Sequence, residues 1–170
     1  MWFRNRREDQ YVVDTSRLTR EQEVDACRAA LQVVRPYVDR FQCDVPWDNR
    51  GAWPHEVVEA ANVLAPLPVG PTSKETYQMT GWVSDFEDET WDAFVTFAPY
   101  AFSADAWTAD MNWLLSVSDE GTRLSVRVTQ DRLGDFKHSV IGADVVLTAD
   151  WNRRRDEEWR LRQNRRQDNS

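Results

Sequence analysis

The chain has 170 residues, a length that suits one domain with one hydrophobic core, and its net charge is −8. It has no run of about 20 apolar residues and no apolar segment behind its N-terminal arginines, so we predict no membrane-spanning or secretory segment and a cytoplasmic protein. Cys27 and Cys43 are too few for a disulfide framework and fit a reducing compartment. We expect one domain over 1–170, with a folded core over 10–162 and flexible ends.

The charge is unevenly distributed along the chain. Residues 41–122 include 14 acidic and 2 basic residues, whereas the flanking segments are slightly basic. An acidic surface repels nucleic acid and favours basic partners. A solvated face without a partner is the alternative interpretation of this segment.

The first predicted helix begins after Thr19, which forms a capping-box pattern with Gln22. Apolar residues then recur at spacings of three and four from Val24 to Phe41, as on the buried side of a helix. Pro36 should kink or restart this helix, because proline removes a backbone donor. A second, shorter helix is predicted from Pro54 to about Leu64.

From Tyr77 onward the apolar period changes to two. The alternation predicts four strands in an antiparallel meander, over 77–84, 91–97, 111–117 and 123–129. Asp119-Glu120-Gly121 predicts a hairpin between the last two strands. Residues 131–148 fit either a fifth strand or the start of a helix, and a C-terminal helix is expected between 143 and 166. The predicted fold is therefore α+β, with N-terminal helices, a four- or five-stranded antiparallel meander sheet and a C-terminal helix.

Candidate catalytic and metal-binding residues are few. The acidic run at 85–92 lacks the ligand spacing of a calcium loop, so a solvated turn between two strands is the preferred interpretation. Cys43 and His55 could meet in space, but neither lies in a nucleophile motif. The arginines of 153–166 are interrupted by acidic residues and form no basic stripe. We predict no catalytic residue, no metal site and no cofactor.

Nine tryptophans are the most unusual feature of the composition. Strand alternation places Trp82, Phe94 and Leu114, with Arg123 and Arg127, on the sheet face opposite the main core. Large apolar side chains on that face need a cover. We expect the cover to be the C-terminal helix, through its own two tryptophans at 151 and 159, or else a partner.

The predicted partner-binding residues are the aromatic residues that the core does not account for, one arginine beside them, and part of the acidic run. They are Trp47, Arg50, Trp53, Trp82, Glu87, Asp88, Glu89, Phe94, Tyr100, Phe102 and Trp107.

We therefore expect a non-catalytic protein-binding module, comparable in size, charge and architecture with toxin-neutralising immunity proteins, secretion chaperones and regulatory adaptors. A basic protein partner suits the acidic middle, neither nucleic acid nor membrane is expected, and both a monomer and a homodimer fit the sequence. The alternative is a small-ligand-binding protein or enzyme whose pocket is lined by Trp47 and Trp53, with Arg50 or His55 as polar anchor. A deep pocket between these tryptophans favours the ligand, and a flat aromatic patch rimmed by carboxylates favours the protein.

Overall fold

The computed structural model describes the backbone of residues 8–65 and 77–167, and the side chains of residues 9–65 and 77–162. The strands are β1 (Glu8–Asp14), β2 (Arg40–Val45), β3 (Gln78–Met79), β4 (Val83–Ser84), β5 (Ser103–Trp107), β6 (Trp113–Ser118), β7 (Arg123–Thr129) and β8 (Asp144–Leu147). The helices are α1 (Arg20–Val34), α2 (His55–Leu64), α3 (Asp88–Phe97), α4 (Gln130–Ser139) and α5 (Thr148–Gln167), with short 3-10 helices η1 (Arg35–Tyr37), η2 (Trp47–Ala52) and η3 (Ala98–Tyr100).

The strands form one open antiparallel sheet in the order β3-β2-β5-β6-β7-β1-β8, and β4 also pairs with β2. The predicted mixture of helices and antiparallel sheet, ending in a helix, is confirmed. The predicted strand count is wrong, because the sheet has more strands than the expected four or five. The described strands and helices begin with β1 at Glu8 and end with α5 at Gln167.

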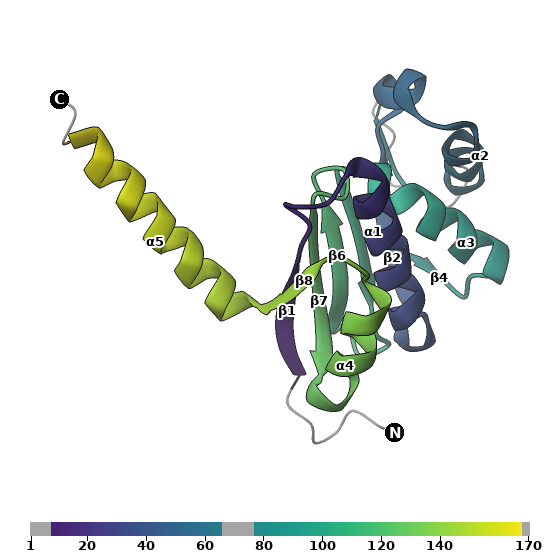
Figure 1. The fold of residues 1–170 in the computed structure, drawn as a ribbon. Helices are drawn as coiled ribbons and strands as arrows, with labels where there is room; N and C mark the ends of the chain where they lie inside the picture. Colours follow the sequence, from purple (N-terminus) through teal and green to yellow (C-terminus); the bar gives the residue numbers. More distant parts are fainter. Residues whose placement is uncertain (1–7, 66–76, 168–170) are drawn as a thin grey trace.

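Helices cover one face of the sheet (Figure 1). Helix α1 contacts β6, α4 contacts β7, and α3 reaches the sheet where the rings of Phe41 and Phe94 stack at 4.2 Å. Alternate strand residues are buried on this face. They are Tyr11, Val13, Phe41, Cys43, Val45, Ala104, Ala106, Leu115, Val117, Leu124, Val126 and Val128. Because successive strand side chains point to opposite sides, the residues between them form the second face.

The predicted start of the first helix is confirmed. Gln22 N donates to Thr19 Oγ1 at 3.4 Å, and Thr19 N donates to the Gln22 side chain at 2.9 Å. Pro36 ends the regular helix, because α1 stops at Val34 and continues only as η1. Phe41 therefore lies in β2 and not on the helix, where the apolar spacing had placed it. The second predicted helix is confirmed as α2.

Residues 91–97 form most of α3, so the strand predicted there is wrong. Trp91, Phe94 and Val95 are buried at the three- and four-residue spacing of a helix. The apolar run had fitted a period of two equally well. A cluster of aromatic rings holds α3 on the sheet. The ring centroid of Phe41 in β2 lies 4.9 Å from that of Phe86, just before α3, and 5.9 Å from that of Trp91 in α3.

The other predicted strands are partly confirmed. β6 and β7 match 111–117 and 123–129, and positive φ angles at Asp119 (52°), Glu120 (56°) and Gly121 (84°) form the hairpin between them. The strand predicted at 77–84 is broken into β3 and β4 around Gly81, whose φ is 64°. Residues 131–148, which fitted either a strand or a helix, contain most of α4 followed by β8.

Helix α5 leaves the end of β8 and runs away from the sheet (Figure 1). It contacts only β1 and β8 closely among the described elements. Trp159 is 62% exposed, so the expectation that it covers the second face of the sheet is wrong, whereas Trp151 is partly buried and lines a groove with Val12 and Ser125 of that face. Glu158 and Arg162, four residues apart on the helix, form an ion pair at 3.8 Å. Within the described residues, no helix combines the length and the apolar character that crossing a bilayer requires.

Candidate functional site

The second face of the sheet carries a row of tryptophans near one end of the strands. Val83 faces the core, so Trp82 projects to the second face, and its ring centroid lies 4.5 Å from that of Trp107. In the antiparallel ladder, Trp107 of β5 lies between Arg40 of β2 and Trp113 of β6. We call Trp82, Trp107 and Trp113 the tryptophan stripe.

A β-bulge turns Trp113 to this face. Ala106 pairs with Leu115 but Trp107 pairs with Trp113, so Leu114 is an extra residue in β6. Leu114 is buried with Leu115 on the helix-covered side. Without the bulge, Trp113 would share a face with Leu115. The predicted position of Leu114 on the second face is therefore wrong, and Trp113, which the sequence had assigned to the core set, takes its place.

Arginines flank the tryptophan stripe. The guanidinium of Arg127 lies 5.8 Å from the ring centre of Trp113, within cation–π range. Arg40, beside Trp107, forms an ion pair with Asp39 at 2.7 Å. The predicted location of Arg127 on the second face agrees with its alternation with buried Val126 and Val128.

The next row across the second face is small and polar. It contains Gln42, Asp105, Ser116 and Ser125, which are Cα partners across four adjacent strands. None of these four side chains is fully exposed or fully buried. This part of the face is therefore polar and lies beside the tryptophan stripe, and Ser125 at its far end lines a groove with Trp151 of α5.

A buried carboxyl lies on the same face, toward the opposite end of β2. Asp44 is fully buried, and its Oδ1 accepts a hydrogen bond from Ser103 N at 3.0 Å. Burial raises the pKa of Asp44, although the hydrogen bond from Ser103 acts in the other direction. Burial, and then the adjacent Asp44, raise the pKa of Tyr77 to about 12. The side chain of Tyr77 is 41% exposed, so an aromatic ring also lies at the surface near this end of β2.

The predicted pair of loop tryptophans packs into the fold. Trp47 and Trp53 lie 6.0 Å apart, and Trp53 meets the ring of Phe97 edge-on at 5.1 Å. Trp47 Nε1 donates to Gln78 at 3.2 Å, and Arg50 lies over the Trp47 ring at 5.7 Å. These contacts occupy both rings, which explains why a polar loop carries two tryptophans.

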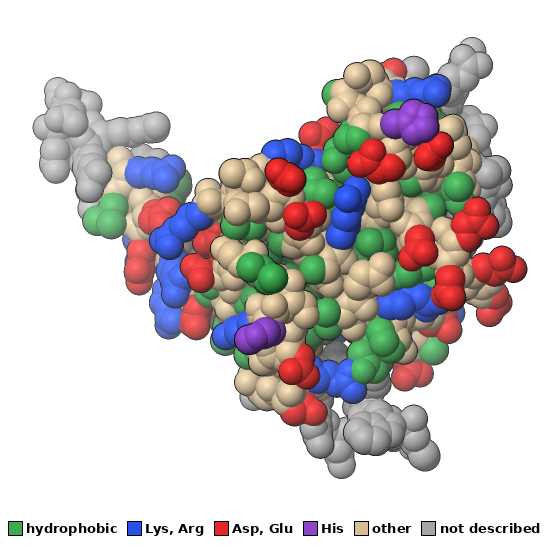
Figure 2. Space-filling view, turned by 45° about the vertical axis from the view of Figure 1, so that its right-hand side comes forward, with side chains coloured by type: hydrophobic (Ala, Val, Ile, Leu, Met, Phe, Trp, Pro, Cys, Tyr) green, Lys and Arg blue, Asp and Glu red, His purple; other side chains and the backbone are tan. Residues whose placement is uncertain are grey.

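The acidic run is the start of α3 and not a turn between strands, which corrects the prediction. Glu87 is the N-cap residue, and Asp88 and Glu89 lie in the first turn, where carboxylates stabilise a helix. Asp88 also pairs with Arg35 at 3.4 Å, and that guanidinium lies 4.7 Å from the centre of the Phe86 ring. Figure 2 shows acidic side chains outnumbering basic ones on the side of the molecule where α2 and α3 lie.

The remaining predicted site residues are separated from the tryptophan stripe. Phe94 is fully buried because it lies on the inner side of α3, so its prediction as a partner contact is wrong. The guanidinium of Arg20 lies over the ring of Tyr100, 5.1 Å from its centre. The same guanidinium donates a hydrogen bond to the backbone carbonyl of Pro99 at 2.7 Å. Phe102 is 45% exposed just before β5.

Cys43 and His55 do not form a catalytic pair. Cys43 is fully buried in β2, and His55 is exposed at the start of α2, 3.6 Å from Glu59. Burial raises the pKa of both cysteines, that of Cys27 to about 12. The described residues include no group of three or more potential metal ligands.

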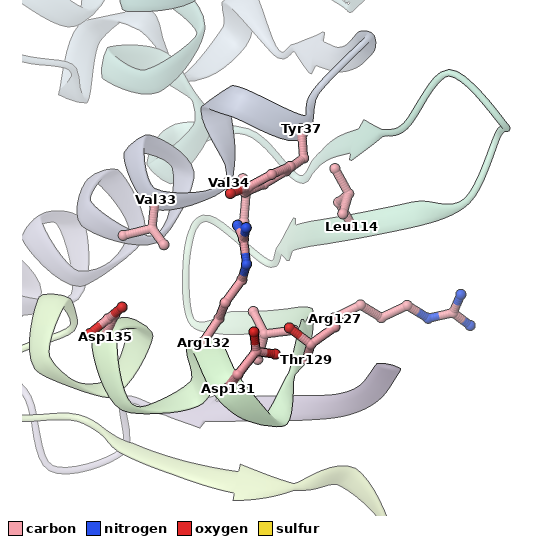
Figure 3. Close-up of a pocket in the computed structure, with 10 residues that line it drawn as sticks. Val33, Val34, Tyr37, Leu114, Arg127, Thr129, Asp131, Arg132 and Asp135 are labelled. Carbon is pink, nitrogen blue, oxygen red and sulfur yellow. The ribbon is translucent and has the colours of Figure 1, made fainter. Parts of the chain in front are cut away.

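The groove in Figure 3 lies between the end of α1 and α4, with a volume of about 450 Å³. Leu114 lies in its wall, and Arg132 crosses it to lie over the ring of Tyr37 at 4.2 Å. Arg127 also lines the groove, but its guanidinium points away from the other lining residues. Two further grooves lie beside β1 and β8, and the three have neither Trp47 nor Trp53 in their walls.

Comparisons with known proteins give no relative, since no family model, no curated protein and no solved structure matches the chain.

Proposed function

We propose that this chain is a non-catalytic protein-binding module and that the tryptophan stripe is its main binding surface. The observation that carries the proposal is the pair of neighbouring indoles of Trp82 and Trp107 on the face of the sheet opposite α1, α3 and α4, with Trp82 47% exposed. Exposed tryptophans with an adjacent arginine are the residues most enriched among the energetic centres of protein interfaces.

The shape of the surface also favours a protein partner. Neither Trp82 nor Trp107 lines the three grooves described above, and their rings lie so close together, at 4.5 Å between centroids, that one partner surface can contact both. Its rim differs from the expected carboxylates, because Arg40 and Arg127 flank the tryptophans. The small polar row beside the stripe suits the hydrogen-bonding rim that interfaces have around an apolar centre.

The net charge of −8 opposes nucleic acid as the partner. The acidic α2–α3 side is a second element of the proposed function, because unneutralised carboxylates steer a basic partner during its approach. Steering of this kind would lower the association rate as salt is raised from about 0.05 M to about 0.5 M, since the screening length falls from above 10 Å toward 4 Å. An association rate that does not change with salt would remove the acidic side from the proposal.

The experiment that tests the stripe is photo-crosslinking in cells of the source organism. A photoreactive phenylalanine replaces Trp107 in one variant and Trp159, which is more exposed but lies on α5, in a matched variant. We expect a discrete protein adduct from position 107 that is absent at position 159. A folded protein that gives no protein adduct at 107, or that crosslinks only to nucleic acid, would contradict the proposal.

A further inference from the structure

The two edges of the sheet differ in how well they can accept another strand. One edge consists of β3 and β4, which have two residues each and are separated by Gly81 in a left-handed conformation. The other edge is β8, a continuous strand that pairs with β1 and has no other described strand beside it. Interrupted edges resist strand addition and regular ones permit it. β8 is therefore the edge open to a partner.

Apolar side chains accompany this edge. Ile141 is 82% exposed, the most exposed of the large apolar residues among those described, and it lies three positions before β8. Val145, Val146 and Leu147 are each only partly buried. Isolated exposed apolar residues are ordinary, but here the residue with the highest exposure adjoins a free strand edge.

The charges at this edge are complementary to one another. A groove of about 370 Å³ beside β8 is lined by Val145 and Val146, by the cations Lys137 and Arg154, and by Asp144. Asp144 is exposed and lies directly opposite Asp14 of β1 in the ladder. Like charges in that position are unfavourable, so Asp144 would gain from a cation on its open side.

We propose that β8 pairs antiparallel with β8 of a second copy of this chain. A two-fold axis midway between the two β8 strands makes the contact isologous, so the second copy's Arg154 approaches Asp144 and the reverse contact forms equally. The same pairing covers the exposed side chain of Ile141 and satisfies the free backbone groups of the edge. This surface is separate from the tryptophan stripe, so the two proposals stand or fall independently.

The test is sedimentation velocity on the full chain and on two charge-reversal variants, Asp144→Arg and Arg154→Glu. Both residues are exposed, and Arg160→Glu on the same helix is the matched control. We expect the wild type and the control to dimerise, and each reversal to raise the dimer dissociation constant at least about tenfold, because like charges then meet twice. An equimolar mixture of the two variants should dimerise again, since every contact in the heterodimer joins opposite charges.

Other outcomes overturn the proposal. A wild-type protein that is monomeric at about 100 μM excludes an interface of useful strength at this edge. A dimer that both reversals leave intact, or that Trp107→Ser disrupts instead, places the contact elsewhere. Single variants that fail to dimerise and are not rescued by mixing would show that Asp144 and Arg154 do not face each other. Circular dichroism on every variant establishes that each is folded.

Discussion

The ring centroids of Trp82 and Trp107 lie 4.5 Å apart, inclined at 57°, although β2 separates β4, which Trp82 directly precedes, from β5, which contains Trp107. The two rings therefore meet across the face of the middle strand, on the side of the sheet away from the core. The same protein buries Trp91 almost completely, at 2% exposure. Its tryptophans thus serve two purposes, one group closing the core and another lying on a surface.

Substitution of tryptophans in these two settings should have different effects on stability. Trp91→Ala should lower the free energy of unfolding by roughly 3–5 kcal/mol, the range for removing a buried large aromatic side chain. Trp82→Ser should cost about 1 kcal/mol or less and Trp159→Ser about 0.5 kcal/mol or less, because Trp82 is about half exposed and Trp159 is mostly exposed. Denaturant unfolding monitored by circular dichroism measures all three. Equal losses for Trp82→Ser and Trp91→Ala would show that the second face is covered.

The hairpin between β6 and β7 should depend on one glycine. Gly121 has a φ of 84°, and a Cβ at this position would lie 3.0 Å from the carbonyl oxygen of Pro99. Gly121→Ala should therefore destabilise the protein by roughly 1–3 kcal/mol, from backbone strain and the close contact. Gly51→Ala is the control, because nothing lies within 4 Å of its added Cβ. Chemical denaturation of both variants checks this, and an unaffected Gly121→Ala would mean that the hairpin relaxes freely.

The buried thiols should be unreactive in the folded protein. Burial raises the pKa of Cys27 from 9.0 to about 12, so at pH 8 neither its thiolate fraction nor its access favours reaction with a disulfide reagent. We expect slow labelling of both cysteines in buffer and fast labelling in denaturant. Rapid labelling of either cysteine under native conditions would contradict the burial of β2 and α1.

The same shift predicts a loss of stability at high pH. A group whose pKa is higher in the folded state stabilises fully below its unfolded value of 9.0, and this contribution disappears as pH rises toward about 12. Tyr77, raised from 10.0 to about 12, acts in the same direction. Thermal melting between pH 8 and pH 11 should show falling stability, and Cys27→Ala should reduce the slope.

The sequence predicted those parts of the fold whose signals are local. The capping box of Thr19 and Gln22 and the hairpin glycine act within a few residues, and both are confirmed. Residues 91–97 were assigned to a strand, because alternation and helical spacing coincide over so short a run and only packing against Phe41 decides between them. β5 escaped notice because its core-facing residues are the alanines Ala104 and Ala106.

The candidate site was predicted in part, for a related reason. Trp82 and Trp107 were among the predicted contacts, and the structure brings them together. Trp113 was missed because a strict period of two places its side chain on the core face. The bulge at Leu114 turns Trp113 to the second face instead. That bulge depends on how β6 pairs with β5, which the residues of β6 alone do not reveal. Phe94 was included wrongly through the same dependence on local period.

The central claim, that the tryptophan stripe binds a protein, is tested most directly by quantitative co-purification from cells of the source organism. Tagged wild type, Trp107→Ser and Trp159→Ser proteins are compared by mass spectrometry, after thermal melts have shown that all three are folded. We predict at least one protein that the wild type and Trp159→Ser retain and that Trp107→Ser loses by tenfold or more, as about 1.4 kcal/mol or more of lost binding energy requires. An identical set of proteins at equal yield from all three would contradict the claim.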